Sequence, residues 1–278
     1  MQEDGAFHDV TTLQIPRIAQ QHASARLLVK QKGVFSGGDL IGSLFRLLDP
    51  QARVKILIPD GRRVKPKQVA ARITAKSSAL LAGERLLLNL VGHMSGIATL
   101  SDLYCQAIKG TKAVITDTRK TTPLWRDLEK YAVECGGGLN HRFSLSDAIL
   151  VKDNHHQILM RQKLSPEDVY NESKLRSKKR NWKFVCMEAT NDAQVWGAIR
   201  SRVDIILLDN MPLNQIKGSM ELIFAARKAF GTSFPLAEVS GGVNLTNVRK
   251  FAELGVDRIS VGALTHSAPA LDISLEVN

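Results

Sequence analysis

The sequence has few cysteines, and none of the spacings that cysteines take in metal sites. Its 278 residues include three, Cys105, Cys135 and Cys186, an odd number at wide separations. A disulfide framework or a CxxC metal site needs paired or closely spaced cysteines. We therefore expect all three to be reduced and mostly buried.

Long apolar runs and a secretory leader are also lacking. No stretch approaches the run of about 18 apolar residues that a membrane span requires. The opening residues, MQEDGAFHDV, are acidic where a secretory signal is basic and then apolar. Apolar residues make up 44% of the chain, enough for a sizeable core. We expect a soluble cytoplasmic protein that does not bind membranes.

Acidic residues are outnumbered, which leaves a net charge of +11. Such an excess suits either a polyanion such as nucleic acid or a small, highly charged substrate. Much of it lies in two clusters, Arg53 to Lys76 and Arg161 to Lys183, and no RNP, zinc-finger or KH pattern accompanies them. Charge alone gives only non-specific affinity for nucleic acid, so we favour the small anionic substrate.

From Lys112 onward, short apolar runs alternate with amphipathic segments, as in parallel strands joined by helices. The expected strands are 112–116, 147–151, 183–187, 204–208, 234–239 and 257–261, and the expected helices are 124–135, 191–201, 214–230 and 244–254. Polar or glycine residues follow the strands at 117–120, 152–154, 188, 209–210, 240–242 and 262. Six strand ends converge on one ligand in a barrel but spread into a line in an open sheet, so we favour a barrel, complete or incomplete.

The first hundred residues lack this rhythm. They contain β-like runs at 25–31, 54–58 and 68–75, followed by a long apolar helical stretch at 77–108 that we expect to break near Gly96. This pattern predicts a separate α+β domain with a boundary near Gly110.

Several segments together carry a resemblance to a known family. They are DTRKTTPLWRDLEKYAVECGGGLNHRFSLSDAILVKDNH (117–155), ERLLLNLVGHMSGIAT (84–99), LLDN (207–210), EVSGGVNL (238–245) and ISVGALTHSAPALDISL (259–275). They resemble quinolinate phosphoribosyltransferase, also called nicotinate-nucleotide pyrophosphorylase (carboxylating), over essentially the whole chain. The resemblance implies an α/β protein in which an N-terminal α+β sandwich domain precedes an incomplete α/β (TIM-like) barrel. We expect the sandwich and connecting helix at 1–110, the barrel at 111–265, and a C-terminal segment at 266–278 that returns to the first domain.

The implied reaction transfers phosphoribosyl from phosphoribosyl pyrophosphate to quinolinate with decarboxylation. Its products are nicotinate mononucleotide, pyrophosphate and carbon dioxide, in de novo NAD biosynthesis.

Quinolinate carries two carboxylates on adjacent ring carbons, so its pocket needs several cations, at least one of them a flat bidentate donor. The resemblance assigns this pocket to Arg119, His141, Arg142 and Lys152. It also implies that Arg85 reaches into the active site of a neighbouring subunit. We therefore expect a homodimer, or a higher oligomer, with shared sites.

The second substrate, phosphoribosyl pyrophosphate, needs a metal for its pyrophosphate and acceptors for its ribose hydroxyls. The resemblance gives this work to Glu188 and Asp209, with Mg²⁺ held mainly through substrate oxygens. It gives Lys120 to the leaving pyrophosphate, so that Lys120, Lys152, Glu188 and Asp209 form the expected catalytic set. Ser240, Gly241, Gly242 and Gly262 are expected to bind the 5-phosphate through close backbone approach. The alternative for Glu188 and Asp209 is simple pairing with the cations of the barrel.

Other features leave alternatives open. A phosphoribosyltransferase-like paralogue of the type found with molybdate transport would keep the fold and use another acceptor, and a nucleic-acid-binding barrel is the alternative from another class. His8 stands where the family usually has glycine, and TTPLW (121–125) lacks the glycine that commonly follows TTP. We expect His155 and His156 to be a surface pair, because no third ligand is spaced for a metal. His266 either lies near the 5-phosphate or caps the barrel mouth.

Overall fold

The structure, a computed structural model, describes residues 1–165, 168 and 182–277. The chain divides into two compact units. Unit 1 comprises Met1–Asp102, Thr121–Gly138 and Leu264–Asn278, and unit 2 comprises Leu103–Lys120 and Leu139–Ala263. Most of the second basic cluster expected from the sequence, between residues 166 and 181, lies outside the described residues.

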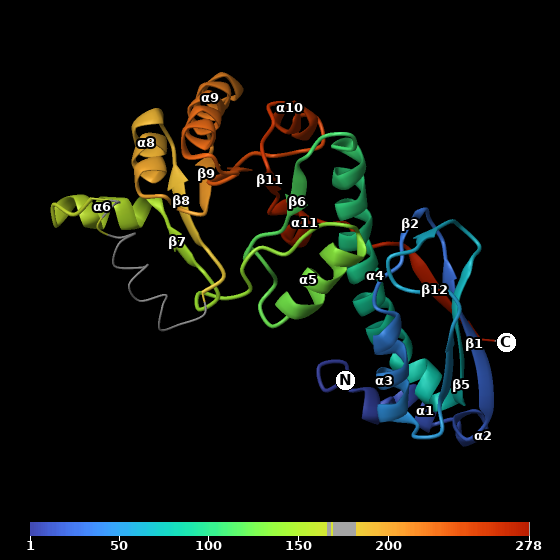
Figure 1. The fold of residues 1–278 in the computed structure, drawn as a ribbon. Helices are drawn as coiled ribbons and strands as arrows, with labels where there is room; N and C mark the ends of the chain where they lie inside the picture. The colour runs from blue at the N-terminus through green and yellow to red at the C-terminus, as the bar shows by residue number, and fades with distance from the viewer. Residues whose placement is uncertain (166–167, 169–181, 278) are drawn as a thin grey trace. The chain divides into compact units, whose positions relative to one another are not determined.

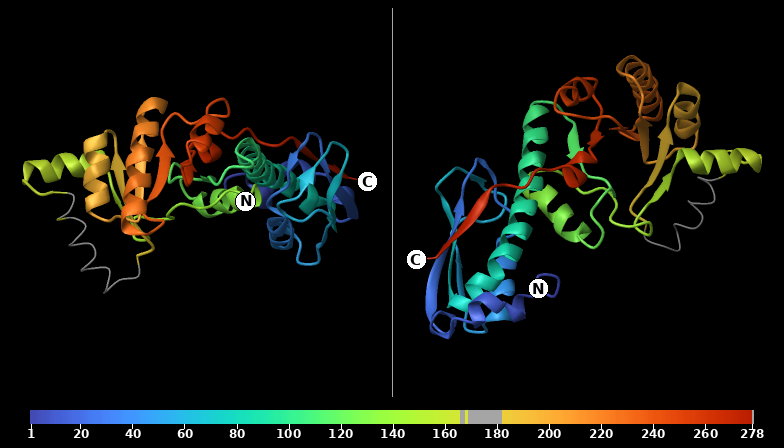
Figure 2. Two further views of the ribbon diagram at one scale, coloured as in Figure 1. Left: turned by 45° about the horizontal axis from the view of Figure 1, so that its top comes forward. Right: turned by 180° about the vertical axis from the view of Figure 1, so that it is seen from behind.

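A four-stranded antiparallel sheet organises unit 1. Its order is β12-β1-β5-β3, with β1 at His22–Val29, β3 at Arg53–Ile56, β5 at Val69–Lys76 and β12 at Ile273–Val277. The last strand pairs with the first, Leu275 opposite Leu27, and Figure 2 shows β12 in red beside β1 in blue. Alternate residues of β1, including Leu27 and Val29, point into the core, as the period of two requires.

Helices and a short hairpin complete unit 1. They are α1 (Val10–Leu13), α2 (Pro16–Ala19), α3 (Gly38–Leu48), α4 (Ser77–Ala107) as far as Asp102, α5 (Arg126–Cys135), the short α11 (Ala263–His266) from Leu264 on, and β2 (Gly33–Val34) paired with β4 (Arg63–Val64). The inner face of the sheet packs on α3 and α4, where Phe45, Leu80 and Leu87 are fully buried with Leu27. Burying four such side chains stabilises the unit by several kcal/mol, at roughly 1.5–3 kcal/mol each.

The break expected near Gly96 does not occur, because α4 is one continuous helix. Gly96 serves close packing instead. A Cβ added at this residue would lie 2.1 Å from the carbonyl oxygen of Pro269, so only glycine lets the two backbones approach so closely. The glycine suggests a helix break when the sequence is read alone. In the structure it instead allows a close backbone contact that any side chain would block.

In the described part of the chain, α4 is also the one helix that is long and apolar enough to cross a membrane by length and composition. Half of that stretch is buried inside the structure, and Leu80, Leu87 and Val91 belong to the core of unit 1. Core helices pass the same test. The character of α4 therefore carries no membrane assignment.

Six parallel strands form the sheet of unit 2. They are β6 (Val114–Thr116), β7 (Ile149–Val151), β8 (Val185–Ala189), β9 (Ile205–Asp209), β10 (Leu236–Ser240) and β11 (Arg258–Ser260), in the order β6-β11-β10-β9-β8-β7. From β7 to β11 the order follows the chain, and β6 then pairs with β11, as it would in a closed ring. No ladder joins β6 to β7 within the described residues. This arrangement confirms the predicted incomplete barrel.

The helices of unit 2 are α6 (Asp153–Arg161), α8 (Asp192–Arg200), α9 (Leu213–Phe230) and α10 (Val248–Glu253). Figure 1 shows α8 and α9 side by side against β8 and β9. The helix expected from Asn244 begins only at Val248. The Asn244 side chain accepts the N–H groups of Thr246 and Asn247, and its carbonyl accepts the N–H of Val248, so Asn244 caps a turn at 245–247 that leads into α10.

Replacing Gly96 by alanine should destabilise unit 1 by about 1–3 kcal/mol, because the new methyl group must displace backbone at Pro269. The matched control is Gly218→Ala in α9, where an added Cβ meets nothing within 4 Å. That change should stabilise the protein by about 0.5–1 kcal/mol through helix propensity. Urea unfolding of both variants gives the comparison. Equal shifts of the same sign would contradict the close-packing role of Gly96.

Candidate active site

The acidic side chains that the sequence suggested for unit 2, Glu188 and Asp209, share one face of the parallel sheet near its carboxyl edge. Side chains two residues apart on a strand point the same way, so Glu188 lies on the face of Cys186, and Asp209 on the face of Leu207. In the ladder, Ser240 pairs with Asp209. Cys186 and Leu207 form a small apolar core on this face. The polar residues therefore lie next to an apolar cluster on the same face of the sheet.

Glu188 lies inside β8 rather than after it, with its side chain buried. Its Oε1 lies 3.3 Å from the Nζ of Lys152, and its Oε2 accepts the N–H of Asp153 at 3.2 Å. This is the pairing with a barrel cation that the sequence left open. Asp209 ends β9, and its Oδ2 accepts a hydrogen bond from the side-chain amide of Asn210 at 2.8 Å.

Two arginines place like charges near each other at this edge. Arg142 is buried, and its Nη1 donates to the carbonyl of Ala148 at 3.1 Å. Burial, followed by the nearby charge of Arg119, lowers the pKa of Arg142. The Nε of Arg119 is buried and has no hydrogen-bond partner in the part of the chain that the structure describes. Buried donors are normally bonded, so this arrangement suits an anion.

His141 lies beside Arg142, with its ring buried. The backbone N–H of His141 donates to Asp117 Oδ1 at 2.8 Å, and the ring Nδ1 accepts the backbone N–H of Arg142 at 2.8 Å. Its Nε2 lies 3.5 Å from Oε1 of Glu238, and the ring meets Phe184 edge to face. The histidine is thus held on several sides by protein groups.

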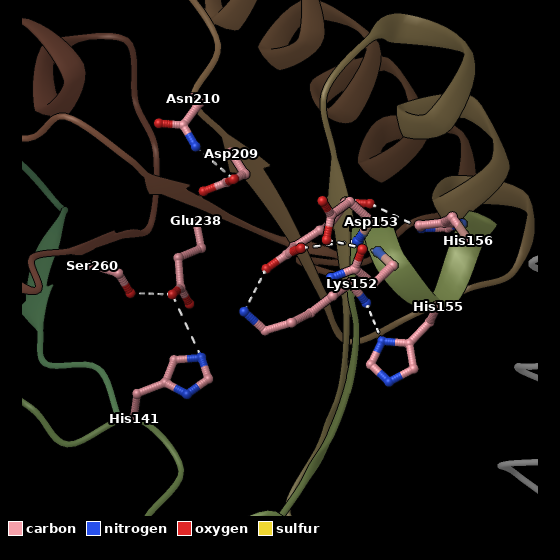
Figure 3. A network of polar contacts seen from close by, with 11 residues as sticks. His141, Lys152, Asp153, His155, His156, Asp209, Asn210, Glu238 and Ser260 are labelled. Carbon is pink, nitrogen blue, oxygen red and sulfur yellow. Dashed lines mark hydrogen bonds and ion pairs between the residues drawn. The ribbon is translucent and has the colours of Figure 1, made fainter. Parts of the chain in front are cut away.

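Glu238 is the site residue that sequence reasoning missed. It is fully buried in β10, and Ser260 Oγ donates to its Oε1, while Figure 3 shows His141 and Ser260 both directed at its carboxyl group. Burial raises its pKa to about 7, against the opposing effects of the Ser260 hydrogen bond and the charge of Arg258. The signal was available, because Glu238 precedes Ser240 by two residues and must share its face.

The two glycines after β10 have left-handed backbone conformations. Gly241 and Gly242 have φ of 87° and 63°, the left-handed region that favours glycine. A Cβ on Gly241 would lie 2.1 Å from the side-chain oxygen of Asn210. The loop from Ser240 to Gly242 precedes α10, but the helix begins at Val248, so residues 243–247 lie between them.

The remaining predicted residues are more dispersed. Lys120 is exposed, and its backbone N–H donates to Thr118 Oγ1 at 3.1 Å. Gly262 follows β11 in unit 2. Arg85 is exposed on α4 and belongs to unit 1. His266 is exposed, with its Nδ1 2.6 Å from Ser267 Oγ.

The expectation of a surface histidine pair was wrong for one member. His156 is buried, with its Nε2 3.2 Å from the carbonyl oxygen of Glu188, whereas the exposed His155 accepts the N–H of Lys152. Within the described residues, no three His, Cys, Asp or Glu side chains gather as a metal cage. The three cysteines are free thiols, and only Cys186 is fully buried.

Comparisons with known proteins decide the family. The profile of the quinolinate phosphoribosyl transferase N-terminal domain matches residues 9–95, and that of the C-terminal domain matches residues 97–276. The chain belongs to the quinolinate phosphoribosyl transferase family. A probable nicotinate-nucleotide pyrophosphorylase (carboxylating) of Bacillus subtilis is 36% identical over 99% of this chain and 90% of its own length. The carboxylating enzyme of Mycobacterium leprae is 39% identical over 81% of this chain and 75% of its own.

Solved structures agree with this assignment. The nicotinate-nucleotide pyrophosphorylase of Francisella tularensis is 31% identical, with a TM-score of 0.86 over 99% of this chain and 92% of that one. NadC from Streptococcus pyogenes is 35% identical, with a TM-score of 0.82 over 94% and 87%. This quinolinate phosphoribosyltransferase therefore transfers phosphoribosyl to quinolinate with decarboxylation, in de novo NAD biosynthesis, as the sequence resemblance implied.

The raised pKa of Glu238 predicts how stability depends on pH. With a folded-state pKa of about 7 against an ordinary value of 4.5, the folded protein keeps this proton longer than the unfolded chain. The stabilisation from the proton is complete below pH 4.5 and is lost as pH rises to about 7. Relative to Glu238→Gln, the wild-type protein should lose on the order of 3 kcal/mol over that interval.

Denaturant unfolding of both proteins at several pH values between 4.5 and 8 measures the difference. Two parallel stability curves would contradict a raised pKa at Glu238.

Proposed function

We propose that the carboxyl edge of the parallel sheet in unit 2 is where the family reaction takes place. Arg119, Arg142 and Lys152 would bind the two carboxylates of quinolinate, with His141 completing the pocket. The observation that carries this proposal is the pair Arg119 and Arg142, whose like charges disfavour each other while a buried Nε lacks a hydrogen bond. A dianion with adjacent carboxylates would satisfy both groups.

The donor would occupy the neighbouring strand ends. Glu188 and Asp209, on adjacent strands β8 and β9, offer carboxylate oxygens to the ribose hydroxyls and to Mg²⁺. These oxygens fit that ion, and two acids suffice if the donor pyrophosphate and water supply its other ligands. Bound Mg²⁺ would neutralise charge on the departing pyrophosphate. The exposed Lys120 would add a second cation there.

The 5-phosphate would rest on the loop from Ser240 to Gly242 and on Gly262. Left-handed glycines let successive backbone N–H groups face one anion without a Cβ in between. Gly241 already lies against the Asn210 side chain, so that backbone can approach a ligand only while the residue stays glycine.

In the proposed mechanism the protein positions the two substrates and neutralises their negative charges. The pyridine nitrogen attacks the anomeric carbon as the bond to pyrophosphate breaks, and the oxygen of the leaving group takes the electron pair. The C2 carboxylate then leaves as carbon dioxide, and C2 takes up a proton. The Glu188 carboxylate holds Lys152 at 3.3 Å, which keeps a cation beside the reacting acceptor.

We further propose a cytoplasmic homodimer in which Arg85 serves the active site of the neighbouring subunit. Arg85 is exposed on α4, so its guanidinium is accessible to a second chain. The resemblance of the ER motif to the family supports this role. A dimer with such an exchange is closed by a two-fold axis.

Acceptor and donor roles can be separated by two variants. Arg119→Ala should raise the KM for quinolinate about 10-fold to 100-fold, the value of a charged hydrogen bond, and leave the KM for the donor nearly unchanged. Asp209→Ala should raise the KM for the donor, leave the KM for quinolinate nearly unchanged and shift the magnesium dependence. One assay measures the quinolinate KM, the donor KM and the magnesium dependence. It supplies carboxyl-labelled quinolinate, donor and magnesium, and it scores carbon dioxide and mononucleotide together.

A matched control is Arg200→Ala, which removes an exposed cation from the end of α8 and should change neither constant. No product from folded wild-type protein would overturn the proposed site, and so would equal effects of Arg119→Ala on both substrates.

Mixing experiments test the shared site. If Arg85→Ala and Lys152→Ala are each inactive, a heterodimer contains one site with both lesions and one with neither. Random reassortment should then restore about a quarter of wild-type sites. If Arg85 serves its own chain, mixing restores nothing; that result, with subunit exchange verified by mass spectrometry, would defeat the shared site.

A further inference from the structure

A chain of buried hydrogen bonds crosses three neighbouring strands below the proposed acceptor pocket. Thr116 ends β6, Ser260 ends β11 and Glu238 lies in β10, and all three are buried. The hydroxyl oxygens of Thr116 and Ser260 are 2.8 Å apart, and Ser260 Oγ donates to Glu238 Oε1. Because Ser260 has one hydroxyl proton, which it donates to Glu238, Thr116 must be the donor to Ser260. The chain therefore points toward the carboxyl group.

The ring of His141 lies next to the Glu238 end of this chain, and its hydrogen bond from the backbone of Arg142 defines its tautomer. Its Nδ1 accepts the backbone N–H of Arg142 at 2.8 Å, so that nitrogen carries a lone pair rather than a proton. The neutral ring then has its proton on Nε2, which faces Glu238 Oε1 at 3.5 Å. Protonating Nδ1 would break the bond from Arg142. The geometry thus favours a neutral histidine donating toward Glu238, in place of the cation expected from the sequence.

The consequence falls on Arg142. Its backbone is held by His141, whose own N–H is held by Asp117, and its guanidinium donates to the carbonyl of Ala148. A buried arginine with both its backbone and its side chain fixed loses little conformational entropy when it binds an anion.

We propose that Glu238 is a positioning residue for quinolinate binding: its carboxyl oxygen, 3.5 Å from His141 Nε2, orients the ring that holds the backbone of Arg142, and so orients the arginine toward the acceptor carboxylates. This inference rests on the proposed site and names a residue that does not touch the substrate. Glu238 acts as a hydrogen-bond acceptor, a task that does not require its negative charge.

The surroundings of Glu238 agree with such a role. The charged or titratable groups that face it are Arg258 and Asp117, His141, and the Cys186 thiol on β8. No salt bridge at its carboxyl group offsets its burial within the described residues apart from the contact to His141, and its Oε2 makes no hydrogen bond there. Burying an acidic group without a compensating cation is costly, and its carboxyl oxygen here accepts a hydrogen bond from Ser260.

The test compares two substitutions of similar size. Glu238→Leu removes the carboxyl group that faces His141 and should raise the KM for quinolinate about 10-fold, the effect of one lost polar contact, with kcat and the donor KM within about twofold. Glu238→Gln keeps a carbonyl acceptor and should restore the quinolinate KM to within about twofold of wild type. Equal loss in all three constants, or no rescue by glutamine, would make Glu238 merely structural and overturn the inference.

A second measurement is independent of how well Glu238→Leu folds. Nitrogen-15 NMR of the wild-type protein with labelled histidine should show His141 as the neutral Nε2–H form between pH 5.5 and 8, the range in which an ordinary histidine titrates. An imidazolium signal from His141 within that range would overturn the inference. If wild type turns over quinolinate and Arg119→Ala raises its KM while Glu238→Leu changes nothing, the proposed site stands and this inference fails.

Discussion

Parallel pairing of six short strands determines which side chains of this enzyme can meet. Each strand of unit 2 ends at the same edge, and the ladder sets Ser240 opposite Asp209. The period of two then puts Glu238 on the face of Ser240, and Glu188 on the face of Cys186. A shift of one residue in any strand would turn its polar side chain outward. The chemistry of the edge therefore depends on backbone register before it depends on any side chain.

The fold holds several charged groups at this edge in electrostatically unfavourable positions. Arg119 and Arg142 disfavour each other, Glu188 is committed to Lys152, and Glu238 is buried too deeply to keep a low pKa. A surface would relax such an arrangement by moving side chains into water, whereas strand ends and tight turns prevent it. An anionic ligand at this edge would relieve the repulsion between the two arginines.

Sequence patterns predicted the strands of unit 2 and the polar residues after them, because doubly buried strands are short, apolar and easy to delimit. They missed Glu238 because a lone acid within an apolar strand attracts little notice, although its spacing of two residues from Ser240 already placed both side chains on one face. Gly96 was misjudged for a related reason. A glycine in a helix looks the same whether it ends the helix or lets another backbone come close. His156 likewise looked like a surface residue, because its contact with the carbonyl of Glu188 joins segments far apart in the chain.

The pairing of β12 with β1 has a consequence for how the protein is made. Ala25 and Val277 are partners in the ladder, so the edge of the unit 1 sheet is covered by residues that leave the ribosome about 250 positions after the strand they protect. Until then β1 exposes a row of unpaired backbone groups, the kind of edge that recruits strands from other chains. During synthesis, β1 therefore has no partner on this side until β12 has been made.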